Sequence, residues 1–430
     1  LLGLCVFLSP TASARCDSTV KVDVSDAPEL LSNLGLGRED GPPLMQRSDT
    51  WLIRFSTPAT HDAVKEKLSR QLSTSHLLLK CAQNKNELTG NGAFELCKAT
   101  ACAIPGTNSF RIKVTTKEPR VILAVLFFNE FDMLELYLRE TRRAKVHKTI
   151  IVESNVTHSG IPKPYYFHQC LEQGSACRAR FQPYLGRITL VKRSFRIPFS
   201  GSNSPNETSD IAWEREKASR DALTNGIARN EPNGSIVIFS DVDEIPRAAT
   251  IIKLKRYTAL NRISFPVHFH VDMFYYTFSH KVQNEIWLHP NAVLVGHLRD
   301  GTMASMVRDH AFSYSSRGNG RAARGGGGTV LRNAGWHASF FGGTEQIAKK
   351  LRSYAHREFD VPHITSQEHI NGSIQSGEDV LKRGVYDFDD SSHCSYNYPK
   401  ALKHAPFESE MGPKGCTTDN WDDSSPHDYA

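Results

Sequence analysis

The chain has 430 residues, and its 52 Lys and Arg against 46 Asp and Glu give a formal net charge of +6. This length suits one large domain with a smaller appended unit, because single domains usually span roughly 50 to 250 residues. The positive charge is spread along the sequence without a long basic run, so we expect no nucleic-acid partner.

The sequence starts with an apolar run at residues 1–8, followed by the small residues Ala12-Ser13-Ala14, a pattern typical of a signal-peptidase site. The run is shorter than the roughly 20 residues that cross a bilayer. Residues 1–14 are therefore interpreted as a signal peptide or the remnant of a membrane anchor. Four Asn-X-Ser/Thr sequons also favour the secretory pathway; they start at Asn155, Asn206, Asn233 and Asn371.

Seven of the nine cysteines lie in three groups: Cys81, Cys97 and Cys102; Cys170 and Cys177; Cys394 and Cys416. Such grouping predicts local disulfides formed in an oxidising compartment. Zinc binding is the alternative, but the spacings lack a Cys-X-X-Cys pair.

Residues 15–118 are predicted to be a stem followed by a small disulfide-tied α+β module. Residues 15–50 are rich in Ser, Asp, Gly and Pro, which is typical of a linker. Residues 51–55 alternate as a strand does, and residues 62–72 have helical spacing.

The pattern changes at residue 119. Residues 119–128 are a continuous apolar run, typical of a buried parallel strand, and residues 129–143 have helical spacing. A second strand is predicted at 148–152, ending at Glu153. These elements form a β-α-β unit of an α/β fold, in which ligands bind at the carboxyl ends of the strands.

Further strands are predicted at 188–192 and 235–239, with a helix at 211–223 between them in which Trp213 and Ala222 are plausible buried positions. The last of these strands runs into Ser240-Asp-Val-Asp-Glu244, which places this acidic cluster in the ligand crevice.

The glycine-rich residues 315–328 are interpreted as a surface excursion or as a mobile lid. A lid could bring Arg317, Arg321 or Arg324 to a diphosphate. Residues 386–430, acidic and rich in Ser and Pro, are predicted to be a C-terminal tail.

The acidic cluster carries the strongest chemical signal. In a strand, Asp241 and Asp243 would point to the same side, so both carboxylates could hold Mn²⁺ or Mg²⁺ while Val242 packs behind. The ion would bridge to the diphosphate of a nucleotide-sugar donor. The alternative is a catalytically silent protein with structural Ca²⁺, although the cluster lacks the five to seven spaced oxygen donors of a Ca²⁺ loop.

Six ordered blocks resemble glycosyltransferase family 17, whose members add the bisecting N-acetylglucosamine to the core β-mannose of N-glycans. The resemblance covers roughly residues 119–385, and its blocks are Phe128–Asp132, Val152–Asn155 with Ser159–Pro164, Trp213–Leu223, Phe239–Arg247, Gly335–His337 and Leu351–Asp360. It implies a GT-A catalytic domain at 119–385, UDP-N-acetylglucosamine as donor, Mn²⁺, inversion at the anomeric carbon, and a glycoprotein glycan as acceptor in the Golgi lumen.

Carried over to this chain, the resemblance makes Asp241 and Asp243 the metal and diphosphate residues. It places Glu153 near the uracil or ribose, with Asn129 and Glu130 lining the same cleft.

Arg220 and Asp221 could meet the ribose or sugar, or could form an exposed ion pair on the helix face. His337 is the candidate for the remaining metal ligand, with a hydrogen-bonded core histidine as the alternative. Trp336 could stack on a sugar or fill the core.

Inversion requires a general base to take the proton of the acceptor hydroxyl. Glu358 and Asp360 are possible bases, as are Glu244 and Asp272, and the sequence does not rank them. Residues 1–118, 268–275 and 315–328 depart from the family pattern, so another sugar or a polysaccharide acceptor stays open.

Overall fold

The computed structural model describes residues 118–195, 209–227, 231–259, 262–283, 285–315, 328–384, 387–389, 399–402 and 411, together with five strands among the first 117 residues. The helix expected at 62–72, most of the glycine-rich segment and most of the tail lie outside these ranges. Within them, no helix is both long and apolar enough to cross a membrane. The chain divides into two compact units, one of Leu1–Glu118 with Tyr257–Arg262 and one of Pro119–Arg256 with Ile263–Ala430.

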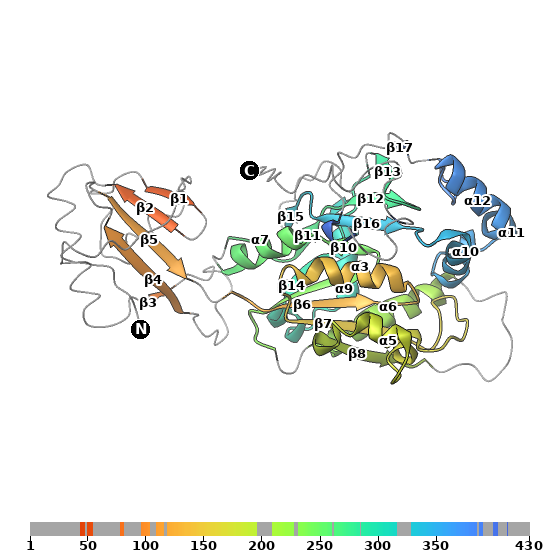
Figure 1. The fold of residues 1–430 in the computed structure, drawn as a ribbon, viewed down its shortest axis with the longest axis horizontal. Helices are drawn as coiled ribbons and strands as arrows, with labels where there is room; N and C mark the ends of the chain where they lie inside the picture. Colours follow the sequence, from red (N-terminus) through yellow and green to blue (C-terminus); the bar gives the residue numbers. More distant parts are fainter. Residues whose placement is uncertain are drawn as a thin grey trace. The chain divides into compact units, whose positions relative to one another are not determined.

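The described strands of the first unit form an antiparallel sheet in the order β1-β2-β5-β4-β3 (Figure 1). Their bounds are Leu44–Arg47 (β1), Thr50–Arg54 (β2), Leu78–Lys80 (β3), Leu96–Ala103 (β4) and Ser109–Thr115 (β5). The strand predicted at 51–55 is confirmed as β2.

The second unit contains a seven-stranded sheet in the order β15-β11-β14-β9-β6-β7-β8. Its parallel half holds the four predicted strands, all confirmed: β6 (Val121–Leu126), β7 (Lys148–Ser154), β8 (Ile188–Arg193) and β9 (Ile236–Asp241). Beyond β9, the strand β14 (Asn291–Leu294) is antiparallel to β9 and to β11 (Val267–Phe269), and β15 (Thr329–Leu331) is parallel to β11. The α/β class is therefore correct, and the sheet is mixed.

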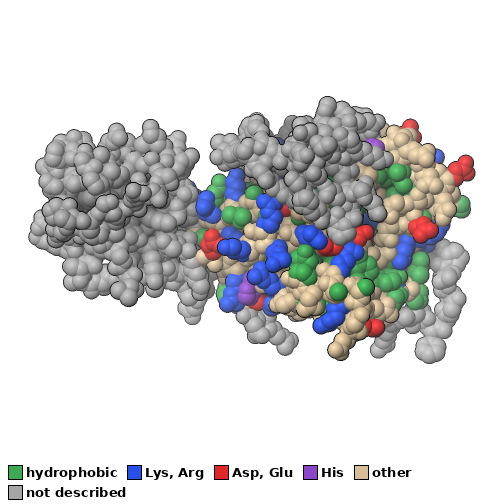
Figure 2. Space-filling view, in the orientation of Figure 1, with side chains coloured by type: hydrophobic (Ala, Val, Ile, Leu, Met, Phe, Trp, Pro, Cys, Tyr) green, Lys and Arg blue, Asp and Glu red, His purple; other side chains and the backbone are tan. Residues whose placement is uncertain are grey.

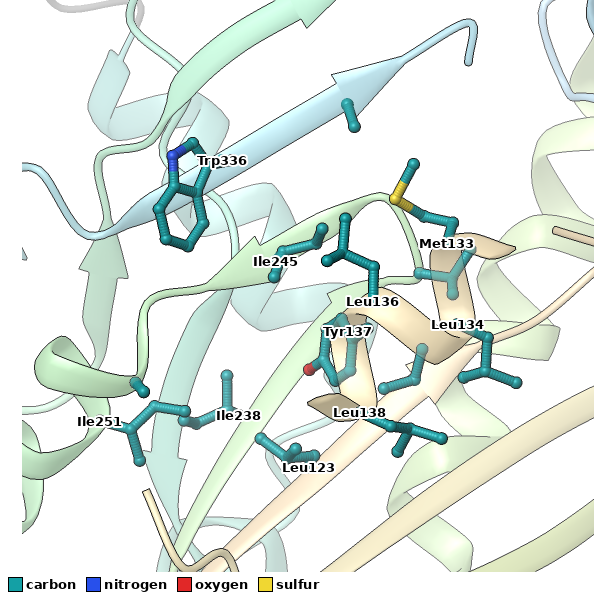
Figure 3. Close-up of a cluster of buried hydrophobic side chains, with 14 of the residues drawn as sticks. Leu123, Met133, Leu134, Leu136, Tyr137, Leu138, Ile238, Ile245, Ile251 and Trp336 are labelled. Atoms are coloured by element: carbon teal, nitrogen blue, oxygen red, sulfur yellow. The ribbon is translucent and has the colours of Figure 1, made fainter. Parts of the chain in front are cut away.

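The two predicted helices, α3 (Phe131–Arg142) and α6 (Ser209–Asn225), are confirmed and pack against opposite faces of this sheet. Alternate residues of a strand point to opposite faces. Leu123 and Ile238 thus join the side chains of α3 in the core shown in Figure 3. The intervening residues, such as Ala124 and Val237, pack with α6 and with α9 (Ala304–Ser315).

The prediction that Trp213 is buried is wrong, whereas Ala222 is buried as predicted. Ala222 belongs to the core cluster that α6 forms with the sheet, but Trp213 lies near the start of α6 and is 40% exposed. The indole instead lines the pocket described below.

A second sheet follows the order β10-β16-β12-β13-β17. Its strands are Glu244–Pro246 (β10), Gly335–Ser339 (β16), Asp272–Tyr275 (β12), His280–Gln283 (β13) and Asp387–Asp389 (β17). Side chains of β12 and β13 share a core with the helices α10 (Gly343–Ser353), α11 (Pro362–Thr365) and α12 (Gln367–Ser376). Because β10 starts three residues after β9 ends, the acidic cluster lies where the two sheets meet.

The remaining helices are short, apart from α7 (Ala248–Ala259): α4 (Tyr166–Cys170), α5 (Ala176–Phe181), α8 (Val295–Arg299) and the 3-10 turns η2 (Leu185–Arg187), η3 (Arg357–Phe359) and η4 (Lys400–Leu402). A disulfide joins Cys170 in α4 to Cys177 in α5, so the predicted local pairing is confirmed there. The other cysteine side chains lie outside the described part of the chain.

On the face shown in Figure 2, Lys and Arg side chains are interspersed with hydrophobic and acidic ones.

Candidate active site

A pocket of about 500 Å³ lies at the carboxyl ends of β6, β7 and β9. Residues of α6, α9, α10, β12, β16 and the segment 353–359 complete its wall. Asp241, Asp243 and Glu244 line this pocket, as expected from their place after a buried parallel strand.

The acidic cluster occupies a tight turn and not a continuous strand. β9 ends at Asp241, Val242 and Asp243 form the turn, and Glu244 begins β10. The argument from strand alternation therefore does not apply to the two aspartates. Val242 packs into the hydrophobic core, as expected, and this anchors the turn.

Asp241 is held by two arginines. Arg220 of α6 donates to both carboxylate oxygens, at 2.8 and 3.3 Å, and Arg308 of α9 lies 3.1 Å from Oδ2. Burial acts to raise the pKa of Asp241, but the two guanidiniums outweigh it and lower this pKa to about 2. The carboxylate is therefore ionised at every physiological pH.

Asp243 has a different set of partners. Its Oδ2 accepts a hydrogen bond of 2.6 Å from Lys350 Nζ and lies 3.7 Å from His337 Nε2. Burial opposes ionisation, yet Lys350 and His337 hold the pKa of Asp243 well below its usual range. The His337 ring stacks on Trp287, with 4.6 Å between centroids.

The Asp243 and His337 pair has the chemistry of a metal site. The two donor atoms are close enough to share one cation, since each ligand lies about 2.1 Å from a bound Mg²⁺. His337 Nδ1 is a buried atom without a hydrogen-bond partner. Both oxygens of Asp241 already contact guanidinium groups. Among the described residues, no three or more His, Cys, Asp or Glu side chains are placed to hold one ion, so phosphate or water oxygens would have to complete the shell.

Glu244 is fully buried and links the turn to Trp287 and Arg308 by hydrogen bonds. Its oxygens accept from the backbone N–H of Asp241, from Trp287 Nε1 and from both terminal nitrogens of Arg308. These hydrogen bonds fix the turn and the arginine together. They occupy both oxygens of Glu244, which argues against the prediction that it is the general base.

Of the two residues expected on the helix before the acidic cluster, Arg220 lines the pocket and Asp221 does not. Arg220 is buried and also binds Glu216 at 2.8 Å, so it is not an exposed helix-face pair. Asp221 contacts the neighbouring helix of the same layer, α9, where it accepts from the backbone N–H of Ser305.

The three residues expected in the cleft of the uracil or ribose have different surroundings. Glu130 lines the pocket, whereas Asn129 exchanges hydrogen bonds with Gln346 and is not part of the wall. Glu153 is fully buried and accepts from the backbone N–H groups of Phe167 and His168 at the start of α4. Its neighbours Val152 and Ser154 line the pocket, because alternate residues of β7 point to the opposite face.

Trp336 fills the core and does not face the pocket. It is 1% exposed and packs near Ile245 (Figure 3), with the Arg247 guanidinium 4.1 Å from its ring centroid. The sugar-stacking alternative for Trp336 is therefore wrong.

The other proposed bases lie outside the pocket wall. Glu358 is exposed and pairs with His356 at 2.7 Å, Asp360 pairs with Arg357, and Asp272 pairs with Lys281. The carboxylates that do line the pocket, besides the acidic cluster, are Glu130, Glu216 and Asp309.

Sequence reasoning missed several residues of this pocket, namely Lys163, Trp213, Glu216, Trp287, Arg308 and Lys350. Lys163, Trp213 and Glu216 do lie in blocks that resemble the family, a signal that could have identified them. Arg308 and Lys350 lie in helices with no motif of their own, 64 and 107 residues from the acids that they contact.

The comparisons with known proteins agree with one another. The family model described as glycosyltransferase family 17 matches residues 82–390. The match begins well before residue 119, so the expectation that residues 1–118 match nothing in the family is wrong for their last part.

Two curated relatives carry the name beta-1,4-mannosyl-glycoprotein 4-beta-N-acetylglucosaminyltransferase. The human protein is 25% identical over 280 residues, which is 60% of this chain and 48% of the relative. The rat protein is 26% identical over 258 residues, 56% of this chain and 44% of the relative. The match thus spans less than half the length of these relatives. Since the family model covers well over half of the chain, the chain belongs to glycosyltransferase family 17.

Proposed function

We propose that the protein is a GT-A glycosyltransferase that moves N-acetylglucosamine from UDP-N-acetylglucosamine to a β-mannose of an N-glycan, with inversion. The observation that carries the proposal is the Asp241-Val-Asp243 turn in a pocket at the carboxyl edge of a parallel sheet, within a family 17 chain. The names of the human and rat relatives support the choice of sugar and acceptor.

The charges of the pocket suit a diphosphate. Arg220, Arg308, Lys350 and Lys163 all line it, and fixed cations stabilise the negative charge that grows on a departing nucleoside diphosphate. Asp241 and Asp243 hold three of these cations in place by ion pairs.

A divalent ion would be held by Asp243 and His337, with Asp241 as a candidate third ligand if the donor draws its arginines away. Mn²⁺ or Mg²⁺ bound there would supply Lewis-acid stabilisation of the diphosphate leaving group. We propose metal dependence on this basis, supported by the short separation of the two donor atoms.

In the reaction, the acceptor hydroxyl oxygen forms a bond to the anomeric carbon while the bond from that carbon to the diphosphate oxygen breaks. A carboxylate takes the hydroxyl proton. We expect this base among the carboxylates that line the pocket, because the base must lie within hydrogen-bond reach of the acceptor.

The experiment is a transfer assay with the full chain, Mn²⁺ and a mannose-containing N-glycan acceptor, followed by mass spectrometry. UDP-N-acetylglucosamine should add one N-acetylhexosamine, and removing divalent ions with EDTA should abolish the addition. Turnover confined to UDP-glucose or UDP-galactose would reject the donor, and turnover that survives EDTA would reject the metal.

We also propose that the protein works in the secretory pathway, in the Golgi lumen, either secreted or anchored by its N-terminal segment. The Cys170–Cys177 disulfide supports an oxidising compartment, because disulfides are rare in the cytosol. Glycan mapping of the secreted or membrane-bound protein tests this proposal.

A further inference from the structure

One face of α6 is turned towards the pocket along two helical turns. Trp213, Glu216 and Arg220 all line the pocket, and their spacing of three and then four residues puts them in one stripe of the helix. With a rise of 1.5 Å per residue, the stripe is about 10 Å long. An aromatic ring, a carboxylate and a guanidinium therefore follow one another along one wall.

The aromatic end of this stripe is part of a larger wall. The His356 ring lies edge to face with Trp213, at 4.7 Å between centroids and 83° between planes. His356 in turn contacts the rings of Tyr354 and Phe359, and all four rings line the pocket. Two segments far apart in sequence thus bring aromatic surface to the same place, and 40% of Trp213 stays exposed there.

The polar end of the stripe is joined to the acidic turn. Glu216 binds Arg220 at 2.8 Å and lies 3.7 Å from His158, and Arg220 binds Asp241. From Trp213 to Arg220, the stripe has a ring, an acceptor of hydroxyl hydrogen bonds and a cation, and Lys217 and Ser219 of the same helix also line the pocket. A nucleoside diphosphate has the matching order of base, ribose diol and diphosphate, and 10 Å is comparable to its extended length.

We propose that α6 is the cradle of the nucleotide, with Trp213 stacking on the base, Glu216 accepting from the ribose hydroxyls and Arg220 facing the diphosphate. This inference rests on the proposed function, in which the donor is a nucleotide-sugar. The cradle lies at the carboxyl edge of the parallel strands, where open α/β sheets place nucleotides. It takes over the role expected for Glu153, which is buried beneath α4.

The test is isothermal titration of the full chain with UDP, without sugar or acceptor. Trp213→Ala should weaken UDP binding by roughly 5- to 100-fold, the range that base–aromatic stacking supplies, and Trp213→Phe should restore most of it. Ile211→Ala is the matched control, because Ile211 is equally exposed on the same helix and does not line the pocket. This control should bind UDP as the wild type does.

Steady-state kinetics distinguish a role of Trp213 in binding the base of the donor from a role in binding the acceptor. Trp213→Ala should raise the donor KM and leave the acceptor KM and the melting temperature unchanged. If Trp213→Ala binds UDP as tightly as the wild type, or changes only the acceptor KM, the cradle is overturned and the proposed function is not. If the wild type binds neither UDP nor GDP, both proposals fail. Binding of GDP alone that Trp213→Ala weakens would reject the UDP donor and keep the cradle.

Discussion

Asp241 and Asp243 lie one residue apart but hold different partners. Two arginines neutralise Asp241, whereas Lys350 and the His337 imidazole face Asp243. Both carboxylates are ionised because these cations outweigh the cost of burial. The two positions therefore have different partners, with Asp241 organising cations and Asp243 facing the side on which we propose that a metal ion binds.

Asp243→Asn removes the charge that Lys350 and a metal would share. We expect transfer to fall by on the order of 100-fold or more, since electrostatic stabilisation of the leaving group is lost. We expect the free energy of unfolding to fall by only about 1 to 3 kcal/mol, because the partly exposed Lys350 can reach water. Transfer assays and thermal unfolding measure the two effects.

The matched control for this change is Asp272→Asn. Asp272 also pairs with a lysine, Lys281 at 2.8 Å, but does not line the pocket. Its transfer rate should stay close to that of the wild type. A melting temperature that collapses for Asp243→Asn while turnover persists would favour a structural cation site instead.

Lys163 gives the pocket a pH dependence. Burial lowers the pKa of Lys163 to about 8, although Glu153 and Glu130 oppose the shift. UDP affinity should therefore fall as the pH rises through about 8 or slightly above, where the ammonium loses its charge. Titrations of UDP between pH 7 and 9.5 measure this, and Lys163→Gln should flatten the profile.

The lowered pKa of Lys163 also determines whether the free energy of unfolding rises or falls with pH. The folded pKa lies below the ordinary value of 10.5, so between about 8 and 10.5 the unfolded chain binds more protons. In this window the contribution of Lys163 makes the free energy of unfolding rise with pH. Lys349 helps to lower the pKa of Lys163, so Lys349→Gln should move the midpoint of UDP binding to higher pH. An unchanged midpoint would contradict the assignment to Lys163.

At the scale of the elements, the sequence predicts the parallel half of the main sheet and the helices α3 and α6. These elements have local signals, since β6 is a continuous apolar run and α3 has helical spacing. The second sheet could not be predicted, because its strands have only three to five residues and, apart from β12 with β13, pair across long stretches of chain. Strands this short contain too few residues for their alternating pattern to be distinguished from that of a loop.

The residues of the site also differ in whether a local sequence pattern predicts them. The acidic cluster could be placed at the pocket because it directly follows a predicted strand. Arg308 and Lys350 reach it through tertiary packing, which no local pattern encodes. Trp213 was misassigned because helical spacing marks a face of α6 but does not say where the sheet beneath it ends.

The position of Glu153 in β7 determines which face of the sheet its side chain lies on. It is the last residue but one of β7, lies on the face opposite the pocket, and holds the start of α4 through the N–H groups of Phe167 and His168. Glu153→Gln keeps one accepting oxygen and loses the other, so we expect the free energy of unfolding to fall by about 1 to 3 kcal/mol. UDP affinity should stay within a small factor, and chemical denaturation with UDP titration measures both.

Glu358→Gln is the companion variant. Its carboxylate is exposed and pairs only with His356 among the described contacts, and exposed pairs contribute roughly 0 to 1 kcal/mol. Stability and transfer should both stay near the wild-type values. If Glu153→Gln instead lost UDP affinity with unchanged stability, Glu153 would contact the donor as the family resemblance implied.

At the scale of the whole molecule, every residue that lines the pocket lies between Leu126 and Arg383, within the second compact unit. The family match nevertheless begins at residue 82, inside the first unit, so the boundaries of the family and of the compact units differ. The matched region also covers less than half of the human and rat relatives. On the proposed function, we expect donor binding to depend on the second unit alone.

Deleting residues 1–118 tests this expectation. The shortened chain keeps all lining residues and the three core clusters that surround them. We expect it to bind UDP with the affinity of the full chain, because each cation and carboxylate of the pocket has its described partners within the second unit. Titration with UDP, alongside circular dichroism to verify folding, checks this. A folded shortened chain with weaker UDP binding would show that the first unit contributes to the donor site, whereas unchanged UDP binding with lost transfer would assign that unit to the acceptor.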